Sequence, residues 1–458
     1  MEARTTSWKI HNIPKQIKRN VLLGLIKGQL NHENFSLSFK DNRRVATLIT
    51  QEDTLPEIMH KGRALDIRRM NVEVRDVKDI VTPLNKMSYA SQLEKKASDV
   101  KEMFSHLGCA EVESVASPLE VGYRNKCEFT FGFSSENVPT LGFRPAKFTS
   151  APNLVADPKE CTFNTPEEML SLVQAVNSYL PEKAGLVYNR ITNTGFLRLL
   201  CLRRLGEHLV CILQANCESF ECALDNKMVC DFIDTLPGDV FLSCSTGIFD
   251  GLLRDSELRQ VKGEKRQYKE VLNGCTFEVF PLGFFQVNKG VAQILVQTLQ
   301  KSIETDTVLD ICCGSGSLGI CVAKGTQKKV VGLELSQESV NDAKANAELN
   351  GVDAKYFCGS VEKTLPCVLE KTKEPASALI DPPRAGISDK LARGIAQHSN
   401  ISEIFYISCS YSSVKSNIEA ISKTYALKKI YVLDMFPFTK DVECIFHFVR
   451  KPETAPAA

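Results

Sequence analysis

Long hydrophobic runs are missing from this sequence. No uninterrupted apolar stretch in its 458 residues approaches the ~18 residues that a bilayer-spanning helix needs. The first seven residues, Met-Glu-Ala-Arg-Thr-Thr-Ser, also lack the apolar core of a secretory signal. We therefore expect neither a membrane-spanning segment nor export, and we expect the protein to work in the cytoplasm, the nucleus or both.

An excess of charge of one sign is also missing, because 56 Lys and Arg residues nearly balance 55 Asp and Glu residues, for a net charge of +1. This balance argues against a protein coated with nucleic-acid-binding charge. Residues 1–80 are an exception, since they hold 15 Lys and Arg against 10 Asp and Glu. A basic partner surface is therefore expected partly at the N-terminus.

Cysteine is plentiful, at 17 residues, but no Cys-x-x-Cys pair occurs. The nearest regular pair, Cys217 and Cys222, has no neighbouring histidine or second pair that would complete a zinc site. Cysteines scattered through a long chain without a signal peptide are typical of a reducing compartment. We therefore predict reduced thiols and no metal.

The composition, 43% hydrophobic and 24% charged, is that of a globular protein with sizeable cores. The length is about three times that of a typical ~150-residue domain. We predict three domains, over residues 1–80, 88–285 and 286–452, with residues 80–87 as a linker.

The N-terminal block alternates strand-like and helix-like stretches in the order β-α-β-β-α-β. Its two helices are expected at Ile17–Leu30 and Leu55–His60. This is the order of the ferredoxin-like unit that RNA-recognition motifs (RRMs) share, so we predict an RRM-like domain. Where those modules place stacking aromatics, this chain has Lys9, Val45 and Thr47, which disfavours base stacking on the sheet. Two interpretations stay open, RNA binding by the charge of Lys9, Arg43 and Arg44, and a small basic interaction module.

The middle block is rich in strands, which predicts an α+β domain with largely antiparallel pairing. Its first helix, Tyr89–Leu107, ends at Gly108, and Asn273-Gly274 marks a tight hairpin turn. Residues 306–450 instead alternate buried apolar strands with helices. That alternation predicts an α/β, Rossmann-like C-terminal domain with a doubly wound parallel sheet.

A nucleotide-site pattern opens the C-terminal block. The strand Thr307–Ile311 precedes the loop Cys312-Cys-Gly-Ser-Gly-Ser317, whose glycines let the backbone turn sharply and approach a ligand closely. Glu334 ends the next strand, about where a ribose-binding acid belongs. By itself the pattern fits a nicotinamide enzyme, an S-adenosylmethionine enzyme or a purely structural loop.

Two further strand ends favour a methyltransferase. The strand Ala376–Ile380 leads into Asp381-Pro-Pro-Arg384, where two prolines form a rigid wall against which a planar base can be held. A dehydrogenase has no comparable need for such a wall. The next strand, Glu403–Ser408, delivers Cys409 to the same carboxyl edge of the sheet, where ligands bind in such folds.

Methylation at C5 of a pyrimidine would give Cys409 a role. C5 becomes nucleophilic when a thiolate adds at C6 and turns the ring into an enolate. A base must then remove the C5 proton before the thiolate can leave. Glu443 is the candidate base, because it lies between Val442 and Cys444 in a run typical of a buried strand. Taken singly, Cys409 is more often a buried small hydrophobe and Glu443 a solvated carboxylate.

These motifs, in this order, give the chain a resemblance to the RNA 5-methyluridine (uracil-C5) methyltransferase family over about residues 85–450. The motifs are Pro118-Leu-Glu-Val-Gly-Tyr-Arg-Asn-Lys126 with Phe129, Gly283-Phe-Phe-Gln-Val-Asn288, Asp310 through Ser317, Asp381-Pro-Pro-Arg-Ala-Gly386, Tyr406-Ile-Ser-Cys409, and Phe436-Pro-Phe-Thr439 to Glu443-Cys444.

The resemblance implies an enzyme that uses S-adenosyl-L-methionine to methylate C5 of a uridine in RNA, with Cys409 as nucleophile and Glu443 as proton acceptor. The implied cofactor-binding residues are Gln286, Cys312, Gly314, Ser317, Glu334 and Asp381. With an N-terminal RRM-like module and no cysteine-ligated iron–sulfur segment, the chain is most similar to eukaryotic enzymes that methylate the T-loop uridine 54 of tRNA. The implied partner is therefore tRNA.

Two places depart from the family pattern. Asp441 stands where the family often has His, and a second carboxylate there would raise the pKa of Glu443 by like-charge repulsion. The cofactor loop has Cys312-Cys313 and Ser317 where relatives commonly have an aromatic residue before the cysteine and an Asn later.

Three alternative functions share parts of this pattern. Cytosine-C5 methylation is disfavoured, because those enzymes keep a cysteine in or beside the Asp-Pro motif, where this chain has Arg384. Methylation of another uridine, in rRNA or mRNA, stays open. A tRNA-binding or folding protein with a vestigial site is disfavoured by the intact Cys409 and Glu443.

Overall fold

The computed structural model describes residues 6–11, 13–14, 17–30, 35–39, 45–50, 54–60, 63–69, 72–108, 111–246, 257–371 and 374–452. The chain divides into two compact units. The first unit comprises Met1–Val81, Lys126–Arg204 and His208–Lys265, and the second comprises Thr82–Asn125, Leu205–Glu207 and Arg266–Ala458. Compared with the three predicted blocks, residues 1–81 group with most of the middle block, and residues 82–125 group with the C-terminal block. None of the helices that the structure describes is long and apolar enough to cross a membrane.

The N-terminal part of the first unit is a four-stranded sheet in the order β2-β3-β1-β6. Its elements are β1 (Thr6–His11), α1 (Arg19–Gln29), β2 (Phe35–Phe39), β3 (Ala46–Thr50), β4 (Met59–His60), β5 (Arg63–Ala64) and β6 (Asp66–Arg69). Leu22 and Ile26 of α1 pack with Ile10 of β1 and Leu48 of β3 in a small core. Lys9 lies in register with Thr47, whereas Arg43 and Arg44 lie outside the described residues.

The predicted second helix of this block, Leu55–His60, is wrong. Residues 54–60 contain no helix, and Met59–His60 instead pairs with Arg63–Ala64 in a short hairpin. Pro56 contributes to the difference, because it disfavours helical geometry at Leu55, the first residue of the predicted helix. Ile58 nevertheless contributes to the small core. The RRM-like character of the block therefore stays an expectation.

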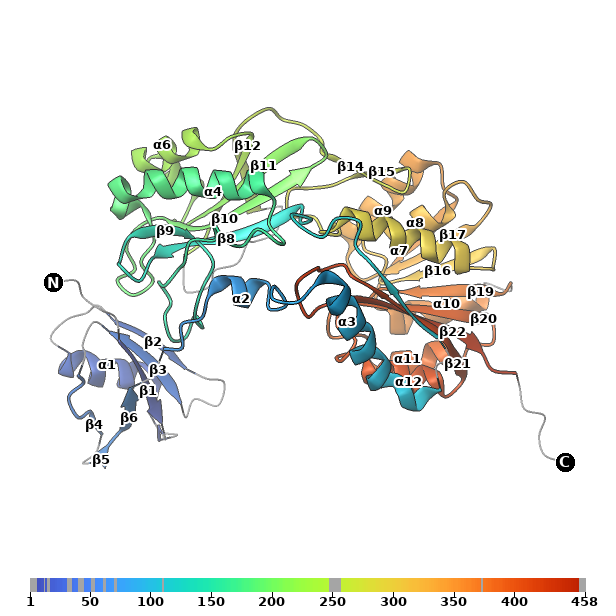
Figure 1. Cartoon of the computed structure of the whole chain (residues 1–458), viewed down its shortest axis with the longest axis horizontal. Helices are drawn as coiled ribbons and strands as arrows, with labels where there is room; N and C mark the ends of the chain where they lie inside the picture. The colour runs from blue at the N-terminus through green and yellow to red at the C-terminus, as the bar shows by residue number, and fades with distance from the viewer. Residues whose placement is uncertain are drawn as a thin grey trace. The chain divides into compact units, whose positions relative to one another are not determined.

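A six-stranded sheet in the order β13-β12-β11-β10-β8-β9 forms the rest of the first unit. Its elements are β8 (Lys126–Phe133), β9 (Pro139–Gly142), α4 (Glu167–Tyr179), the 3-10 segment η2 (Leu180–Leu186), β10 (Leu197–Leu205), β11 (His208–Ala215), α5 (Phe220–Leu224), α6 (Lys227–Thr235), β12 (Asp239–Cys244) and β13 (Leu258–Lys262). The pairs β8–β9, β8–β10 and β12–β13 are antiparallel and β11–β12 is parallel, as the largely antiparallel prediction requires. Helices α4 and α6 pack their apolar residues on one face of this sheet (Figure 1).

The second unit is built on an eight-stranded sheet in the order β18-β17-β16-β19-β20-β22-β21-β7. Its strands are β7 (Glu111–Val115), β16 (Thr307–Ile311), β17 (Lys329–Glu334), β18 (Ala354–Cys358), β19 (Ala376–Ile380), β20 (Ile401–Ser408), β21 (Tyr425–Leu433) and β22 (Glu443–Arg450). A separate hairpin, β14 (Lys269–Leu272) and β15 (Cys275–Glu278), turns at Asn273-Gly274, where both residues have positive φ. The predicted hairpin turn is confirmed.

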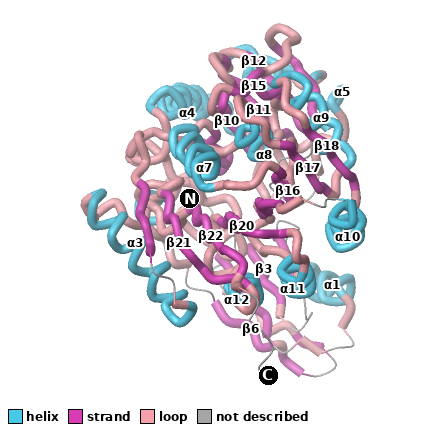
Figure 2. The backbone as a smooth tube through the Cα atoms, turned by 90° about the vertical axis from the view of Figure 1, so that its right-hand side faces the viewer, coloured by secondary structure: helices cyan, strands magenta, loops and turns pink. Residues whose placement is uncertain are grey.

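Helices cover both faces of the eight-stranded sheet, which confirms the doubly wound prediction. They are α3 (Tyr89–Phe104), α7 (Lys289–Ser302), α8 (Ser317–Ala323), α9 (Gln337–Asn350), α10 (Val361–Lys371), α11 (Asp389–Gln397) and α12 (Lys415–Ser422). The helices α7, α8 and α9 lie on one face, and α3, α10, α11 and α12 lie on the other (Figures 1 and 2). A core of strand and helix side chains fills the second of these interfaces.

Residues 82–125 join this second unit through strand β7 and through helix α3, whose Val100 and Phe104 belong to its core. The strand β7 lies parallel to β21, with Glu111 opposite Lys429 and Val115 opposite Leu433. Helix α3 precedes β7 and ends, through the 3-10 turn η1 (Ser105–Leu107), at Gly108 with φ +68°. Residues 80–87, the predicted linker, contain the end of α2 (Val77–Val81) and a turn with buried Leu84.

Candidate active site

The predicted site residues gather at one edge of the eight-stranded sheet. The strands β16, β17, β19 and β20 run parallel, so their carboxyl ends meet at that edge. Cys312 follows β16, Glu334 ends β17, Asp381 follows β19 and Cys409 follows β20. The chain order reverses between β16 and β19, and open α/β sheets bind ligands in the crevice at such a point.

Glu443 reaches the same edge by a different route. The strand β22 runs antiparallel to β20, so the first residue of β22 lies beside the end of β20. The register pairs Ser408 with Cys444, which places Glu443 next to the position of Cys409. Glu443 is 4% exposed, so the prediction that it lies in a buried strand is confirmed.

The glycine loop after β16 is held by carboxylates at both ends. Glu334 accepts a hydrogen bond from the N–H of Gly314 at 3.1 Å. Asp310, buried at the end of β16, accepts one from the N–H of Gly319 at 3.0 Å. Gly316 has φ +77°, and a Cβ there would lie 2.7 Å from the hydroxyl oxygen of Tyr356. The loop therefore requires glycine at this position to keep its path around the strand end.

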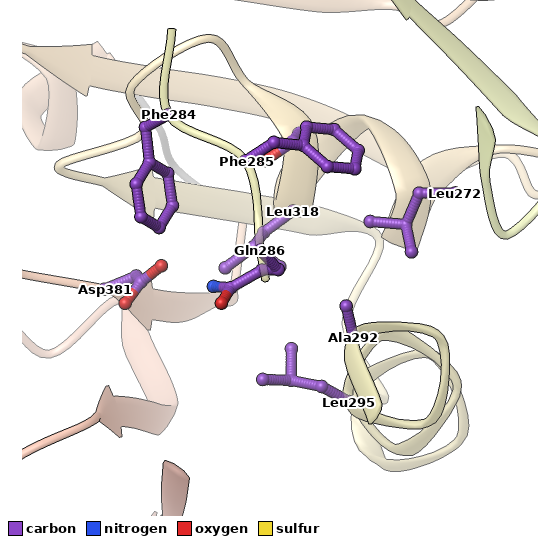
Figure 3. A pocket seen from close by; sticks show the side chains of 9 residues that line it. Leu272, Phe284, Phe285, Gln286, Ala292, Leu295, Leu318 and Asp381 are labelled. Atoms are coloured by element: carbon purple, nitrogen blue, oxygen red, sulfur yellow. The ribbon is translucent and has the colours of Figure 1, made fainter. Parts of the chain in front are cut away.

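A pocket next to this loop brings together three of the six predicted cofactor residues. Gln286, Ser317 and Asp381 line it, together with Leu272, Phe284, Phe285, Ala292, Leu295 and Leu318. The Asp381 carboxylate and the Gln286 amide point toward one another, with Phe284 beside them (Figure 3). Cys312, Gly314 and Glu334 are not among the residues that line this pocket and lie around the adjacent strand ends.

Acidic side chains dominate the electrostatics of this edge. Burial raises the pKa of Asp381 to about 7. Burial also raises the pKa of Asp310 to about 7; the Gly319 N–H opposes this rise, and the charges of Asp381 and Glu334 add to it. Such a group of carboxyls favours a cationic ligand, because a nearby positive charge stabilises their ionised forms.

The environment of Cys409 combines opposing influences. Burial raises the pKa of the Cys409 thiol and the charge of Glu443 raises it further. Arg384 lowers it through its charge and through a hydrogen bond from its side chain. Burial also raises the pKa of Glu443 well above its ordinary range, with a further contribution from Asp381 and an opposing one from Arg384. One thiol, two carboxyls and one guanidinium thus interact at the edge of the sheet.

The expected influence of Asp441 is not what the structure shows. The carboxylate that raises the pKa of Glu443 is Asp381, whereas Asp441 is exposed and its N–H donates to the Thr439 hydroxyl at 3.1 Å. Asp441 lies in the loop that precedes β22, and Asp381 follows β19 at the same edge as Glu443. The repulsion therefore comes from a residue distant in sequence and close in space.

Arg384 and Phe284 also lie at this edge, and the sequence motifs that contain them assign them no role. Arg384 follows the Asp-Pro-Pro wall. Because it comes directly after a parallel strand, its place in the sequence indicates a positive charge at the same sheet edge as Cys409. Phe284 lines the pocket although it is 79% exposed, which is unusual for a phenylalanine. Within the described residues, no group of three or more His, Cys, Asp or Glu side chains is arranged to hold a metal ion.

The sequence of this chain is similar to those of known RNA methyltransferases. The sequence profile of the tRNA (uracil-5-)-methyltransferase family matches residues 256–451. An uncharacterized RNA methyltransferase of Caldanaerobacter subterraneus is 31% identical over 373 residues, covering 78% of this chain and 80% of the relative. The tRNA (uracil(54)-C(5))-methyltransferase of Pyrococcus furiosus is 29% identical over 367 residues, covering 79% of this chain and 81% of the relative.

Among solved structures, this fold is similar to that of the Pyrococcus abyssi tRNA (uracil-54, C5)-methyltransferase in complex with S-adenosyl-L-homocysteine. The TM-score is 0.64 at 23% sequence identity, with 86% of this chain and 92% of that chain covered. The two proteins share the Rossmann-like methyltransferase fold.

Proposed function

The chain belongs to the tRNA (uracil-5-)-methyltransferase family, and on that premise we propose that it methylates C5 of uridine 54 in the T-loop of tRNA through a covalent bond between Cys409 and C6 of the ring. The family depends on S-adenosyl-L-methionine. The P. furiosus relative, which is named for the same uridine, supports this choice of target.

The observation that carries the proposal is the meeting of Cys409 and Glu443 at the ends of neighbouring antiparallel strands. A thiol and a buried carboxyl are the two groups that C5 methylation of uracil requires. Asp381 and Arg384, from the loop after β19, lie within electrostatic reach of both groups. These four side chains, from three strand ends, support the proposal that a pyrimidine ring reacts at this edge of the sheet.

Cys409 acts first in the proposed reaction. Its thiolate adds to C6 of the uracil ring, which moves electrons onto C5 and O4 and makes C5 nucleophilic. Arg384 favours the thiolate, because its charge and hydrogen bond lower the pKa of a thiol that burial would otherwise keep protonated. No acid is needed at N3, since O4 can carry the negative charge.

Glu443 acts after C5 has been methylated. It takes the C5 proton, the electrons of that C–H bond restore the C5–C6 double bond, and the sulfur of Cys409 leaves C6 as thiolate. Burial raises the pKa of Glu443, so its carboxylate is a stronger base than an exposed one. Glu443 therefore combines basicity with protection from water.

The residues of the pocket and the glycine loop fit the cofactor. Gln286, Ser317 and Asp381 would hold it in the pocket, and the loop held by Glu334 would provide backbone N–H groups. Asp310 adds a buried carboxylate whose Oδ1 has no hydrogen-bond partner within the described part of the chain. When bound, S-adenosyl-L-methionine supplies a methyl group on a positively charged sulfonium. The carboxyls at this edge match that charge.

Phe284 has a proposed role in holding the substrate base. A uridine of folded RNA must leave its stack to reach Cys409, and enzymes that extrude bases commonly hold them against aromatic side chains. Phe284 offers an exposed ring beside Asp381 at the pocket (Figure 3). Stacking there would offset part of the few kcal/mol that unstacking costs.

Trapping with 5-fluorouridine tests the proposal. A tRNA T-arm with 5-fluorouridine at position 54 should form a stable complex with the enzyme in the presence of S-adenosyl-L-methionine, because fluorine at C5 cannot be removed as a proton. Cys409→Ala should form no complex and should not transfer methyl groups to ordinary tRNA. Cys367→Ala, which removes an exposed thiol from α10, is the matched control and should behave like wild type.

A complex trapped by Cys409→Ala would contradict the assignment of Cys409 as the nucleophile. Cys444, which lies in the neighbouring strand β22, would then be the first thiol to examine. Mapping the methylated nucleotide tests the target separately. A methyl group on an rRNA or mRNA uridine, with none at position 54 of tRNA, would contradict the choice of substrate and leave the chemistry intact.

A further inference from the structure

Helix α3 carries a buried stripe that changes character along its length. The fold buries four of its residues at a spacing of four, namely Gln92, Lys96, Val100 and Phe104. At the end of the stripe Phe104 packs edge-on against Phe446 of β22, with ring centroids 4.9 Å apart. At its start the stripe is polar, although Gln92 and Lys96 are only 0% and 4% exposed. Buried amide and ammonium groups need hydrogen-bond partners, so the partners of Gln92 and Lys96 identify the segment that helix α3 stabilises.

Both polar side chains of the stripe contact the loop that joins β21 to β22. Lys96 Nζ lies 2.7 Å from Asp434 Oδ1 and donates to the carbonyl of Phe436 at 3.1 Å. Gln92 Oε1 accepts the N–H of Phe438 at 2.9 Å. Every second residue from Asp434 to Phe438 is thus bonded to a side chain of helix α3.

The loop has a backbone conformation that needs support. Phe438 has φ +64°, a left-handed geometry that a bulky residue adopts at an energetic cost. The N–H of Phe438 donates to the side chain of Gln92, and the carbonyl of Phe438 accepts the N–H of Leu84 at 3.0 Å. The Tyr123 hydroxyl donates to the carbonyl of the preceding Pro437 at 3.2 Å. These contacts stabilise one path for the loop.

The path of the loop determines where β22 begins. Residues 439–442 lie between Phe438 and Glu443, so a change at Phe438 is transmitted over a short segment. Glu443 is the first residue of β22 and is therefore more dependent on the loop than the residues that follow it. Cys409, in contrast, follows β20, which precedes α12 and β21 in the chain, and is therefore not part of this loop.

We propose that Lys96 and Gln92 are positioning residues for the proton-removal step: through Asp434 and Phe438 they hold the β21–β22 loop so that Glu443 faces the ring bound to Cys409. This inference rests on the proposed function. It assigns helix α3 an effect on release of the methylated RNA and none on attack by Cys409.

The test compares formation of the covalent complex with its release. Trapping of 5-fluorouridine RNA does not require a base, whereas turnover of ordinary RNA does. We expect Lys96→Met to trap 5-fluorouridine RNA at close to the wild-type rate. Its turnover of ordinary tRNA should fall about 10- to 100-fold, the loss expected when a reacting group is displaced by about 1 Å. Methylated tRNA still attached to Cys409 should accumulate.

Two further variants make the experiment decisive. Lys95→Met removes the neighbouring exposed lysine, which pairs with Asp99 on the same helix, and should match wild type in every measurement. Gln92→Met removes the acceptor of the Phe438 N–H without leaving a buried charge unpaired, so it tests the loop even where Lys96→Met does not fold. We expect Gln92→Met to slow release and to spare trapping.

Glu443→Gln is the reference for a missing base. If it does not accumulate attached RNA, the proposed function is wrong in its choice of base, whatever α3 does. If it accumulates attached RNA while Lys96→Met and Gln92→Met trap and release like Lys95→Met, the positioning role is overturned. Equal losses of trapping and turnover would also overturn it, because a merely structural defect lowers both.

Discussion

Arg384 is the residue whose effect on the proposed chemistry is easiest to isolate. It lies in the loop after β19 and lowers the pKa of Cys409, in opposition to burial and to the charge of Glu443. A cysteine in that setting depends on one neighbouring cation to ionise near neutral pH. The nucleophile and its activating charge therefore come from different strand ends.

Replacing Arg384 with Met should raise the pKa of Cys409. Trapping of 5-fluorouridine RNA should then be slower at neutral pH and should recover as the pH is raised, because the thiolate fraction recovers. The pH profile of the trapping rate measures this directly, with Arg393→Met, an exposed arginine of α11, as the control. A profile for Arg384→Met that coincides with that of wild type would contradict the role of this arginine.

Asp310 and Asp381 predict how cofactor affinity depends on pH. Burial raises the pKa of each to about 7, so without a ligand both lose much of their charge as the pH falls through 7. Their attraction for a positively charged cofactor should be strongest well above pH 7 and should weaken as the pH falls through 7. Calorimetric titration with S-adenosyl-L-methionine should show this fall in affinity together with proton release on binding near pH 7. Affinity that stays constant from mildly acidic to alkaline pH would be inconsistent with the expectation.

At the scale of elements, the strands β17 and β18 support the glycine loop through one close contact. Gly332 lies opposite Tyr356 in their register. A Cβ at Gly332 would lie 2.2 Å from Cδ1 of Tyr356 and 3.0 Å from the sulfur of Cys313. Because Tyr356 also lies against Gly316, a displaced ring would move into the loop.

Gly332→Ala should therefore lower the free energy of unfolding by roughly 1–3 kcal/mol, the usual cost of overpacking, and weaken cofactor binding. Chemical denaturation and cofactor titration measure the two effects. Gly394→Ala is the contrasting control, because its Cβ in helix α11 would meet nothing within 4 Å. It should raise the stability by up to about 1 kcal/mol. Equal effects of the two substitutions would contradict the importance of the Tyr356 contact.

The elements that carry the site could be predicted from the sequence because buried parallel strands are short continuous apolar runs. The predicted strands Thr307–Ile311 and Ala376–Ile380 coincide with β16 and β19 from end to end. Their ends fix where Cys312 and Asp381 lie. The residues that directly follow these strands therefore predicted where the candidate site lies in the sheet.

Three features could not be obtained in this way. The pairing of β7 with β21 joins residues 111–115 to residues 429–433, and local periodicity predicts a strand without naming its partner. The repulsion on Glu443 from Asp381 depends on the same long-range folding. The helix expected at Leu55–His60 is wrong for a local reason, because Pro56 disfavours helical geometry at the residue before it.

At the scale of the whole molecule, residues 1–71 carry an excess of positive charge and can be deleted without removing core residues of the other two large sheets. They hold 13 Lys and Arg against 7 Asp and Glu, and their hydrophobic core contains none of the residues that form the cores of the other two sheets. A deletion that ends there keeps α2 and the bond from Arg75 N–H to the carbonyl of Pro145. The remaining domains therefore keep their own cores.

Deleting residues 1–71 should weaken tRNA binding and make it less dependent on salt, because fewer phosphate contacts release fewer counterions. The same uridine should be methylated, more slowly at low enzyme concentration, since the extruded base is read at the catalytic edge. Dissociation constants over a range of salt concentrations and the map of the methylated nucleotide measure the two effects. Methylation of a different uridine would show that the N-terminal module selects the target.

The antiparallel direction of β22 has a consequence for how the sequence can change. Side chains of a strand alternate between its two faces, so a slip of β22 by one residue against β20 would turn Glu443 away and bring Cys444 beside Cys409. A deletion of one residue from the loop before β22, absorbed by such a slip, would replace the pair of thiol and carboxyl by two adjacent thiols. In evolutionary terms, this stretch of the chain should tolerate changes of residue type more readily than changes of length.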